Sequence, residues 1–165
     1  MAAAVKKAVA VGRCSIKMWH FEMTTSRSLL REAFDWHMRT PKWLRMGGYT
    51  EAGEFVHGLS QGVNYAGYID GQFAGLIHGE HRDDETVEGH CYVGPKVDND
   101  FVTALISFAK REALKTYQKV VVEIPVKHRT MNGLILRAGF FDLGLHKWKG
   151  VVRGRLFETG FYMAR

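Results

Sequence analysis

The segment Lys119–Pro125 (KVVVEIP) constrains the fold most, because it is a nearly continuous apolar run of strand length. Such a run is typical of a strand that is covered on both faces of a sheet. A helix is predicted before it, from about Phe101 to Thr116, and the segment TVEGHCYV (86–93) before that helix indicates another strand. A strand, a helix and a strand in this order predict a right-handed crossover between two parallel strands.

Antiparallel strands are predicted on either side of this crossover. The pair Asp70-Gly71 joins two alternating segments as a tight hairpin turn, and the strand at 86–93 continues the meander. A first strand is predicted at 14–23, and two strands follow Gly139, which closes a short helix. Helical spacing predicts a helix capped by Thr24 or Thr25, and another over 50–59. The predicted fold class is therefore α+β, with a mixed, mostly antiparallel sheet and one parallel β-α-β crossover.

Length and composition indicate a single globular domain at 14–165, preceded by an N-terminal arm at 1–13. The chain has 165 residues and 46% hydrophobic content, enough to bury a full core. Two cysteines, Cys14 and Cys91, cannot build a disulfide framework and indicate a reducing compartment. The start of the chain lacks the apolar core of a signal peptide, and no segment reaches the length of a membrane span. We therefore expect a cytoplasmic protein without a membrane partner.

The formal net charge is +6, which is compatible with nucleic acid, an anionic cofactor or an acidic protein partner. The basic residues form no long run, so a solvated basic surface is the ordinary alternative. One segment, HKWKGVVRGR (146–155), combines cations with an aromatic ring that can stack on bases. Its residues for nucleic-acid binding are Lys147, Trp148, Lys149, Arg153 and Arg155.

The stretch GPKVDNDFVTAL (94–105) leads from the predicted strand at 86–93 into the predicted helix. This spacing and the order of elements resemble the GCN5-related N-acetyltransferase (GNAT) superfamily, over nearly the whole chain from about Cys14. The resemblance implies a GNAT-like sheet with helices on both faces. It also implies that backbone N–H groups at the start of the helix would hold the pyrophosphate of acetyl-CoA.

The residues of this stretch depart from the glycine-rich loop of the superfamily. Aligned from Pro95, the arginine and glycine positions of the pattern fall on Asp98, Asn99, Phe101 and Thr103. Asp98 and Asp100 would repel a pyrophosphate, and Phe101 adds a bulky side chain where glycine lets the backbone approach. We expect Asp98, Asn99 and Asp100 to cap the helix themselves. The degenerate cofactor site implied by the resemblance comprises Val93, Gly94, Asp98, Asn99, Asp100, Phe101 and Thr103, with His128.

A second signature of the superfamily, around its last helix, is also altered in HRTMNGLILRAGF (128–140). Aligned on Gly139, the asparagine position falls on His128 and the alanine position on Met131. The tyrosine that often protonates the departing thiolate falls on Ile135, and isoleucine cannot act as a general acid. Both departures concern chemistry rather than packing, so we expect the fold to be kept and the standard reaction to be lost.

Two residues of the strand at 86–93 are candidates for catalysis. Alternation places Glu88 and His90 on one face, and the resemblance implies that one of them would deprotonate the acceptor amine. The structural alternative is that both are polar residues on the open face of a sheet. His78 and His81 on the preceding strand can approach His90, but their spacing matches no metal-binding motif, so we expect no metal.

Three functions are compatible with these observations. The leading one is a non-catalytic GNAT-fold component of a larger assembly, with protein partners and no cofactor. Its size and altered loop are similar to small GNAT-like internal and head proteins of T7-type phages, which would place it in the host cytoplasm or the virion. The alternative is a divergent N-acetyltransferase that uses acetyl-CoA, and the third is a basic nucleic-acid-binding module.

Overall fold

The described residues form one sheet of eight strands, in the order β1-β2-β3-β4-β5-β6-β8-β7. The computed structural model describes residues 7–9, 17–41, 49–152 and 155–165, and only the backbone of 7–9, 146–152 and 155–158. The strands are β1 (Lys7–Val9), β2 (Lys17–Met23), β3 (Val63–Ile69), β4 (Gln72–His81), β5 (Thr86–Val93), β6 (Lys119–Pro125), β7 (Phe141–Val152) and β8 (Arg155–Ala164). Among these strands, β5 and β6 form the parallel pair, and the other neighbours are antiparallel.

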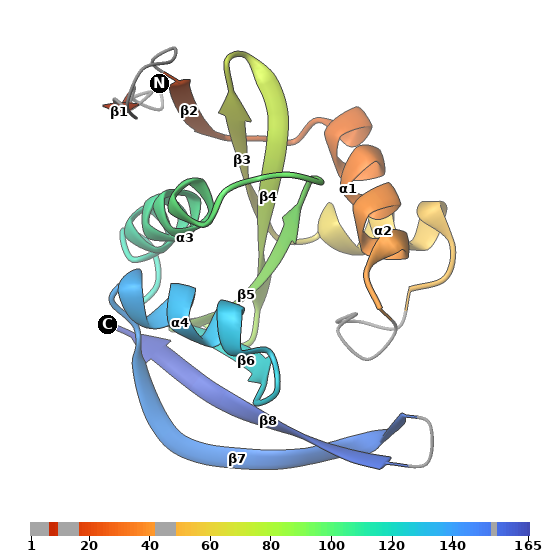
Figure 1. Ribbon diagram of the computed structural model, residues 1–165, viewed down its shortest axis with the longest axis vertical. Helices are drawn as coiled ribbons and strands as arrows, with labels where there is room; N and C mark the ends of the chain where they lie inside the picture. Colours follow the sequence, from red (N-terminus) through yellow and green to blue (C-terminus); the bar gives the residue numbers. More distant parts are fainter. Residues whose placement is uncertain (1–6, 10–16, 42–48, 153–154) are drawn as a thin grey trace.

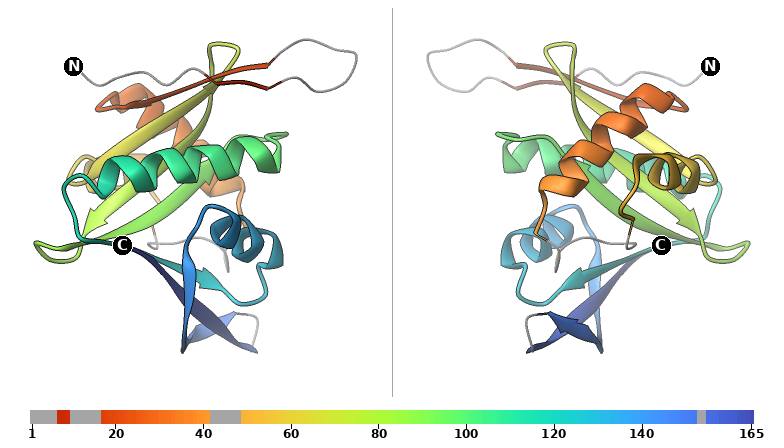
Figure 2. Two further views of the ribbon diagram at one scale, coloured as in Figure 1. Left: turned by 90° about the vertical axis from the view of Figure 1, so that its left-hand side faces the viewer. Right: turned by 90° about the vertical axis from the view of Figure 1, so that its right-hand side faces the viewer.

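Helices cover both faces of the sheet (Figure 1). Helices α1 (Arg27–Arg39) and α2 (Ala52–Leu59) lie together on one face, and α3 (Asn99–Ala113) and α4 (Arg129–Arg137) lie on the other. The two side views in Figure 2 show these pairs from opposite directions. Strand β5, helix α3 and strand β6 form the predicted parallel crossover. The predicted α+β class, with a mixed and mostly antiparallel sheet, is therefore confirmed.

The segments with the strongest local signals fold where the sequence predicts. Strands β5 and β6 occupy the two segments predicted from alternation and from the apolar run. Asp70 and Gly71 have φ angles of 51° and 79°, the left-handed conformation required by the tight turn between β3 and β4. Gly139, with φ of 82°, ends α4 as predicted.

The start of α1 differs from the prediction. Helix α1 begins at Arg27, so Thr24 and Thr25 are not its caps, and that prediction is wrong. The hydroxyl of Thr24 instead accepts a hydrogen bond from the backbone N–H of Ser26 at 3.1 Å, in the turn before the helix. Threonine can stabilise such a turn as readily as a helix start, and sequence alone does not separate the two roles.

The first described strand lies in the segment predicted as an arm. Strand β1 pairs with β2 in antiparallel register, so the segment at 1–13 includes an edge strand. Three residues are too few for a periodic pattern to be read from the sequence.

Helix α3 packs on the sheet through Phe101 and Leu105, which are both 0% exposed. They lie over Gly67 of β3 and Gly75 of β4, which are paired across the ladder; we call these two residues the glycine recess. A Cβ atom on Gly67 would come within 2.8 Å of Phe101 Cζ, and one on Gly75 within 2.8 Å of Leu105 Cδ2. The two glycines therefore let the helix approach the sheet closely.

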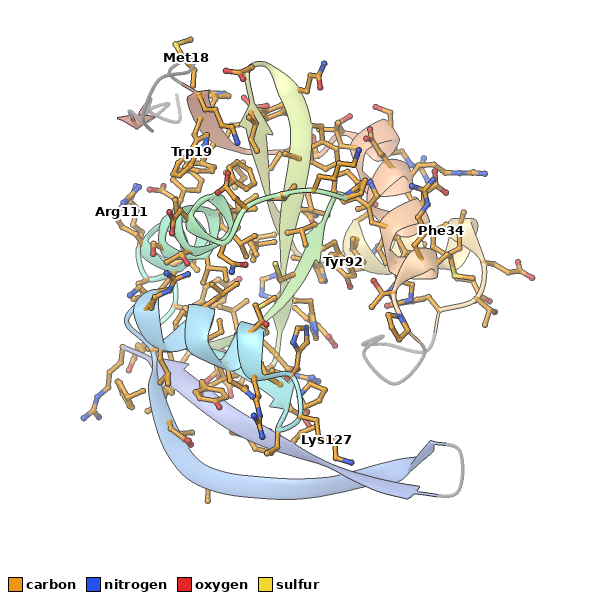
Figure 3. The ribbon with its side chains drawn as sticks, in the orientation of Figure 1. Met18, Trp19, Phe34, Tyr92, Arg111 and Lys127 are labelled. Atoms are coloured by element: carbon orange, nitrogen blue, oxygen red, sulfur yellow. The ribbon has the colours of Figure 1, made fainter. Side chains whose placement is uncertain are left out.

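Aromatic rings from β2 complete this contact. The ring of Trp19 meets Phe101 edge-on at a centroid distance of 5.8 Å, and Phe21 lies 5.6 Å from the same ring. Figure 3 shows Trp19 extending from β2 toward α3. Edge-on and tilted pairs at these distances add to the apolar burial that holds α3 in place.

The parallel strands β5 and β6 pair only over their first residues. Their partners are Thr86 with Lys119, Val87 with Val120, and Glu88 with Val121. Beyond this point β5 keeps its ladder with β4, and β6 keeps its ladder with β8, which already begins at Val120. In the described chain the ladder between β5 and β6 ends there, and we call the divergence of the two strands the β5–β6 split.

The glycine recess can be tested by adding one methyl group. Gly67→Ala should lower the free energy of unfolding by about 1–3 kcal/mol, because the new Cβ would overlap the rigid ring of Phe101. Urea denaturation measures this change.

Gly133→Ala is the matched control, since a Cβ at this exposed position in α4 has no atom within 4 Å. It should raise the free energy of unfolding by up to about 1 kcal/mol through helix propensity. Equal effects of the two substitutions would contradict the account of the recess.

Candidate active site

A cavity of about 120 Å³ lies at the β5–β6 split, and residues of strands β3 to β6 and of helices α3 and α4 line it. Alternation directs Val87 and Val122 toward α3 and α4, and His90 and Glu123 toward the other face of the sheet, where His90 meets Glu80 and Glu88. Its walls are mostly aliphatic, with Ile77, Val87 and Ile106 among them. The residues with polar side chains that line it are Tyr65, His90, Cys91, Lys110, Glu123 and His128. An apolar cavity with a few polar side chains is the usual form of a small-molecule site.

His90 and His128 are the predicted site residues that line this cavity, and His90 is the candidate base. Its Nε2 atom lies 3.3 Å from Oε2 of Glu80 and 3.9 Å from Oε1 of Glu88. An ionised carboxylate only accepts hydrogen bonds, so Nε2–H is the donor. In the neutral ring Nδ1 then carries the lone pair, and His90 can accept a proton there.

Glu88, the other predicted base, is held by an arginine. Arg82 donates from Nε to Oε2 of Glu88 at 2.7 Å, and its Nη2 atom lies 2.5 Å from the same oxygen. Glu88 is not among the residues that line the cavity. Because Arg82 engages this carboxylate and it lies outside the cavity lining, Glu88 is placed to orient His90 rather than to contact a substrate.

Behind His90 lies a second histidine, His78, whose ring stacks on it at a centroid distance of 6.0 Å. The amide of Asn64 donates to the carbonyl of Leu59 at 2.8 Å, so its oxygen faces His78 Nδ1 at 3.0 Å and accepts from it. Burial, together with the nearby charge of His90, lowers the pKa of His78 to about 4. His78 is therefore neutral at physiological pH, and it supports the ring of His90.

Glu123 on β6 is a buried residue of the site that the sequence reading missed. It lines the cavity at 8% exposure, and Oε1 accepts a hydrogen bond from the Thr159 hydroxyl at 2.5 Å. The signal was present, because Glu123 is the charged residue in the middle of the apolar run that predicts β6. A buried carboxylate needs such a partner, and its position in a cavity is a mark of function.

The wall formed by α4 carries His128 and Ile135. Burial lowers the pKa of His128 below its ordinary value, so this half-buried ring at the start of α4 is neutral at pH 7. Ile135 also lines the cavity and supplies only apolar surface. On the opposite wall, burial raises the pKa of the Cys91 thiol to about 12, so Cys91 is no nucleophile at neutral pH.

In the loop from β5 to α3, a side chain of the loop itself caps the start of the helix. Asp98 is the N-cap of α3, and its Oδ1 accepts the Phe101 N–H at 2.8 Å. Its Oδ2 lies 3.2 Å from Nζ of Lys17 on β2. The predicted self-capping is thereby confirmed for Asp98, whereas Asn99 and Asp100 are the first helical residues and not caps.

The predicted obstruction of the loop by Phe101 is wrong. Its side chain is fully buried against the glycine recess, so it does not crowd the loop. Gly94 also serves packing, since its N–H donates to Ala74 at 2.9 Å and a Cβ there would come within 3.2 Å of Trp36. Asp100 is directed toward Arg137 at 3.6 Å, and Thr103 donates to the carbonyl of Asn99 at 2.8 Å. Val93, the last residue of β5, is half-buried and packs against the core.

Other site expectations fall partly outside the described residues. Arg153 is not described, and of Lys147, Trp148, Lys149 and Arg155 only the strand backbone is, so nucleic-acid binding by this hairpin stays a prediction. The ring of His81 is hydrogen-bonded to the Tyr117 hydroxyl at 2.6 Å. Within the described ranges, no group of three or more His, Cys, Asp or Glu residues could hold a metal ion.

A search for membrane spans over the same residues finds no helix that is both long and apolar enough to cross a bilayer.

Comparison with known proteins supports the fold but not a closer relationship. No protein-family model matches the chain, and no curated protein sequence matches it. A putative acetyltransferase from Acinetobacter baylyi superimposes with a TM-score of 0.74 at 15% identity, over 91% of this chain and 94% of that chain. An acetyltransferase of the GNAT family from Streptococcus pneumoniae gives 0.65 at 11% identity, over 87% and 98%. A putative acetyltransferase from Salmonella typhimurium, solved with its cofactor acetyl-CoA, gives 0.65 at 14% identity, over 88% and 93%.

The capping role of Asp98 can be tested by measuring the stability of the protein. Asp98→Ala should lower the free energy of unfolding by about 1 kcal/mol, whereas Asp98→Asn should cost less because asparagine caps equally well. Urea denaturation distinguishes the two, with the half-buried Thr103→Ala, which removes a hydroxyl but no cap, as a control expected within about 0.5 kcal/mol of the wild type. Equal losses for Ala and Asn at position 98 would contradict a capping role.

The buried histidine predicts a dependence of stability on pH. The pKa of His78 is about 4 in the folded chain and near 6.5 when unfolded, so the unfolded chain binds more protons in between. Its contribution is fully present above pH 6.5 and is lost as the pH falls toward 4. Between pH 7.5 and 5.5 we expect a loss of about 1 kcal/mol, measured by urea denaturation. Glutamine at position 78 stays neutral, so His78→Gln should remove this loss of about 1 kcal/mol. If the free energy of unfolding of the variant fell with pH as steeply as that of the wild type, the role of His78 would be contradicted.

Proposed function

We propose that this chain, which has the fold of the GNAT acetyltransferases, transfers an acyl group from a thioester to an amine. The observation that carries the proposal is the cavity at the β5–β6 split, which is lined by His90 and Glu123. A non-catalytic component has no need of ionisable side chains at an apolar cavity, where burying them costs free energy. The solved structures of similar fold also favour this alternative over the binding role expected first.

The split suits the arm of an acyl thioester carrier. Past Glu88 and Val121, peptide groups of β5 and β6 face each other without a shared ladder. Buried peptide groups need hydrogen-bond partners, and the amides of a pantetheine arm can serve as a short additional strand. The aliphatic walls from α3 and α4 fit the methylene groups of such an arm. The residues at the split therefore fit the thioester end of acetyl-CoA.

The outer end of the site, at the start of α3, does not fit the pyrophosphate of acetyl-CoA. The start of α3 is capped by Asp98, and Asp100 lies in its first turn. Neither residue fits a pyrophosphate. The chemistry derived for this chain thus concerns the thioester end alone.

The reaction balances with groups that this chain supplies. A bound thioester provides an activated acyl carbon. A neutral amine attacks that carbon, the C–S bond breaks as the C–N bond forms, and the amine proton passes to Nδ1 of His90. Glu80 and Glu88 face Nε2 of His90 and stabilise the resulting imidazolium. The departing thiolate takes its proton from solvent, since Ile135 offers none.

The substitution His90→Gln tests this role. It keeps a polar side chain of similar size but cannot accept a proton, so we expect kcat to fall about 10²–10⁴-fold. The assay follows release of free thiol from acetyl-CoA with a panel of primary amines: an amino acid, a lysine peptide and a polyamine.

His57→Gln is the matched control, because His57 is exposed on α2 away from the cavity, and its activity should equal that of the wild type. Equal rates for His90→Gln and the wild type would refute the role of His90. Absence of transfer to every amine, together with absence of thioester binding at millimolar concentration, would refute the proposed function.

A further inference from the structure

We propose that this chain recognises its donor through the phosphopantetheine thioester arm alone and makes no use of the ADP half of CoA. The inference rests on the proposed function and names the donor of the same site. It follows from a mismatch between two parts of the site: the β5–β6 split accepts an arm, whereas the start of α3 is closed to a pyrophosphate.

Some of the backbone N–H groups at the outer end are already engaged. The N–H of Gly94 donates to Ala74, and Pro95 has no N–H. At the start of α3 the Phe101 N–H donates to the Asp98 side chain at 2.8 Å, and the Val102 N–H donates to the Asp98 carbonyl at 3.2 Å. A helix start binds an anion through such N–H groups, and here a carboxylate of the chain occupies that role.

The charges at this end also oppose a nucleotide diphosphate. One oxygen of Asp98 is held by the Phe101 N–H and the other lies 3.2 Å from Lys17, so the carboxylate is fixed at the helix start. The side chain of Asp100 is 79% exposed in the first turn, 3.6 Å from Arg137. A pyrophosphate bound here would meet both carboxylates at close range, and like charges repel even in water. Lys17 and Arg137 offset part of this repulsion, since each lies beside one of the two carboxylates.

The inner end has no such conflict. Around the thioester the walls come from α3, α4 and the diverging strands, and their apolar side chains carry no charge that opposes the arm. Binding free energy is therefore available for the pantetheine amides and methylene groups, and little is available beyond the phosphate.

Two sources share this chemistry: free CoA, and the phosphopantetheine group attached to a carrier protein. Both present the same arm and the same thioester, and they differ only beyond the phosphate. A chain that ignores the ADP half gains nothing from CoA over the shorter arm. We therefore expect acetyl-CoA and acetyl-phosphopantetheine to bind this chain with similar affinity.

The experiment compares acetyl-CoA, acetyl-phosphopantetheine and 3′,5′-ADP by isothermal titration and by thiol release. We expect the two thioesters to bind within about threefold of each other and 3′,5′-ADP to give no competition at millimolar concentration. An acetyl-CoA that binds more than tenfold tighter than acetyl-phosphopantetheine would overturn the inference and leave the proposed function standing. Failure of both thioesters to bind would refute the proposed function as well.

An assay with an acetylated acyl carrier protein as the donor shows which of the two sources of the arm this chain uses. A higher kcat/KM for this donor than for acetyl-CoA supports the inference and identifies a carrier protein as the natural donor. An equal value also supports it and identifies free CoA.

A variant without the charges of Asp98 and Asp100 tests whether these carboxylates weaken the binding of acetyl-CoA. Asp98→Asn combined with Asp100→Asn keeps a capping side chain and removes both charges, so acetyl-CoA should bind several-fold tighter while acetyl-phosphopantetheine is unchanged. Asp84→Asn is the control, because Asp84 is exposed in the β4–β5 turn, at the opposite end of β5 from the loop. Equal changes for both thioesters in the double variant would overturn the account.

Discussion

The packing of Phe101 and Leu105 into the glycine recess is the contact on which the rest of the site depends. Gly67 and Gly75 leave space for one face of α3, and aromatic rings from β2 enclose it. Because α3 is the crossover between β5 and β6, its depth on the sheet sets where its first turn lies. The packing of Phe101 and Leu105 against Gly67 and Gly75 therefore fixes the position of the helix start, of the loop before it and of one wall of the cavity.

The second constraint is the short ladder between β5 and β6. Three residue pairs are enough to make the sheet continuous, and the two strands then separate while β6 keeps its ladder with β8. The separation leaves peptide groups at the middle of the sheet and places His90 and Glu123 at the cavity between them. A site built on strand backbone keeps its geometry even when loop residues change.

The sequence predicted the chemistry of the helix start better than its packing. Asp98 was identified as a helix cap from residue type and position, and the structure confirms it. The resemblance predicts that Phe101 crowds the loop, because the aligned position is glycine, yet its side chain is directed into the core. An aligned position gives the identity of a residue but not the direction of its side chain, and that direction follows from the helix starting at Asn99 rather than at Phe101.

Alternation, an apolar run and an Asp-Gly pair determined the strands, the hairpin turn and the parallel crossover, because these are local consequences of backbone geometry. They also placed His90 on the polar face of β5. The tertiary structure alone decided that β5 and β6 diverge after Glu88, that Arg82 holds Glu88 while His90 lines the cavity, and that Glu123 joins it from β6. The physical reason is distance along the chain: a cavity forms where segments far apart in sequence meet, and no local pattern records how far apart two strands will lie.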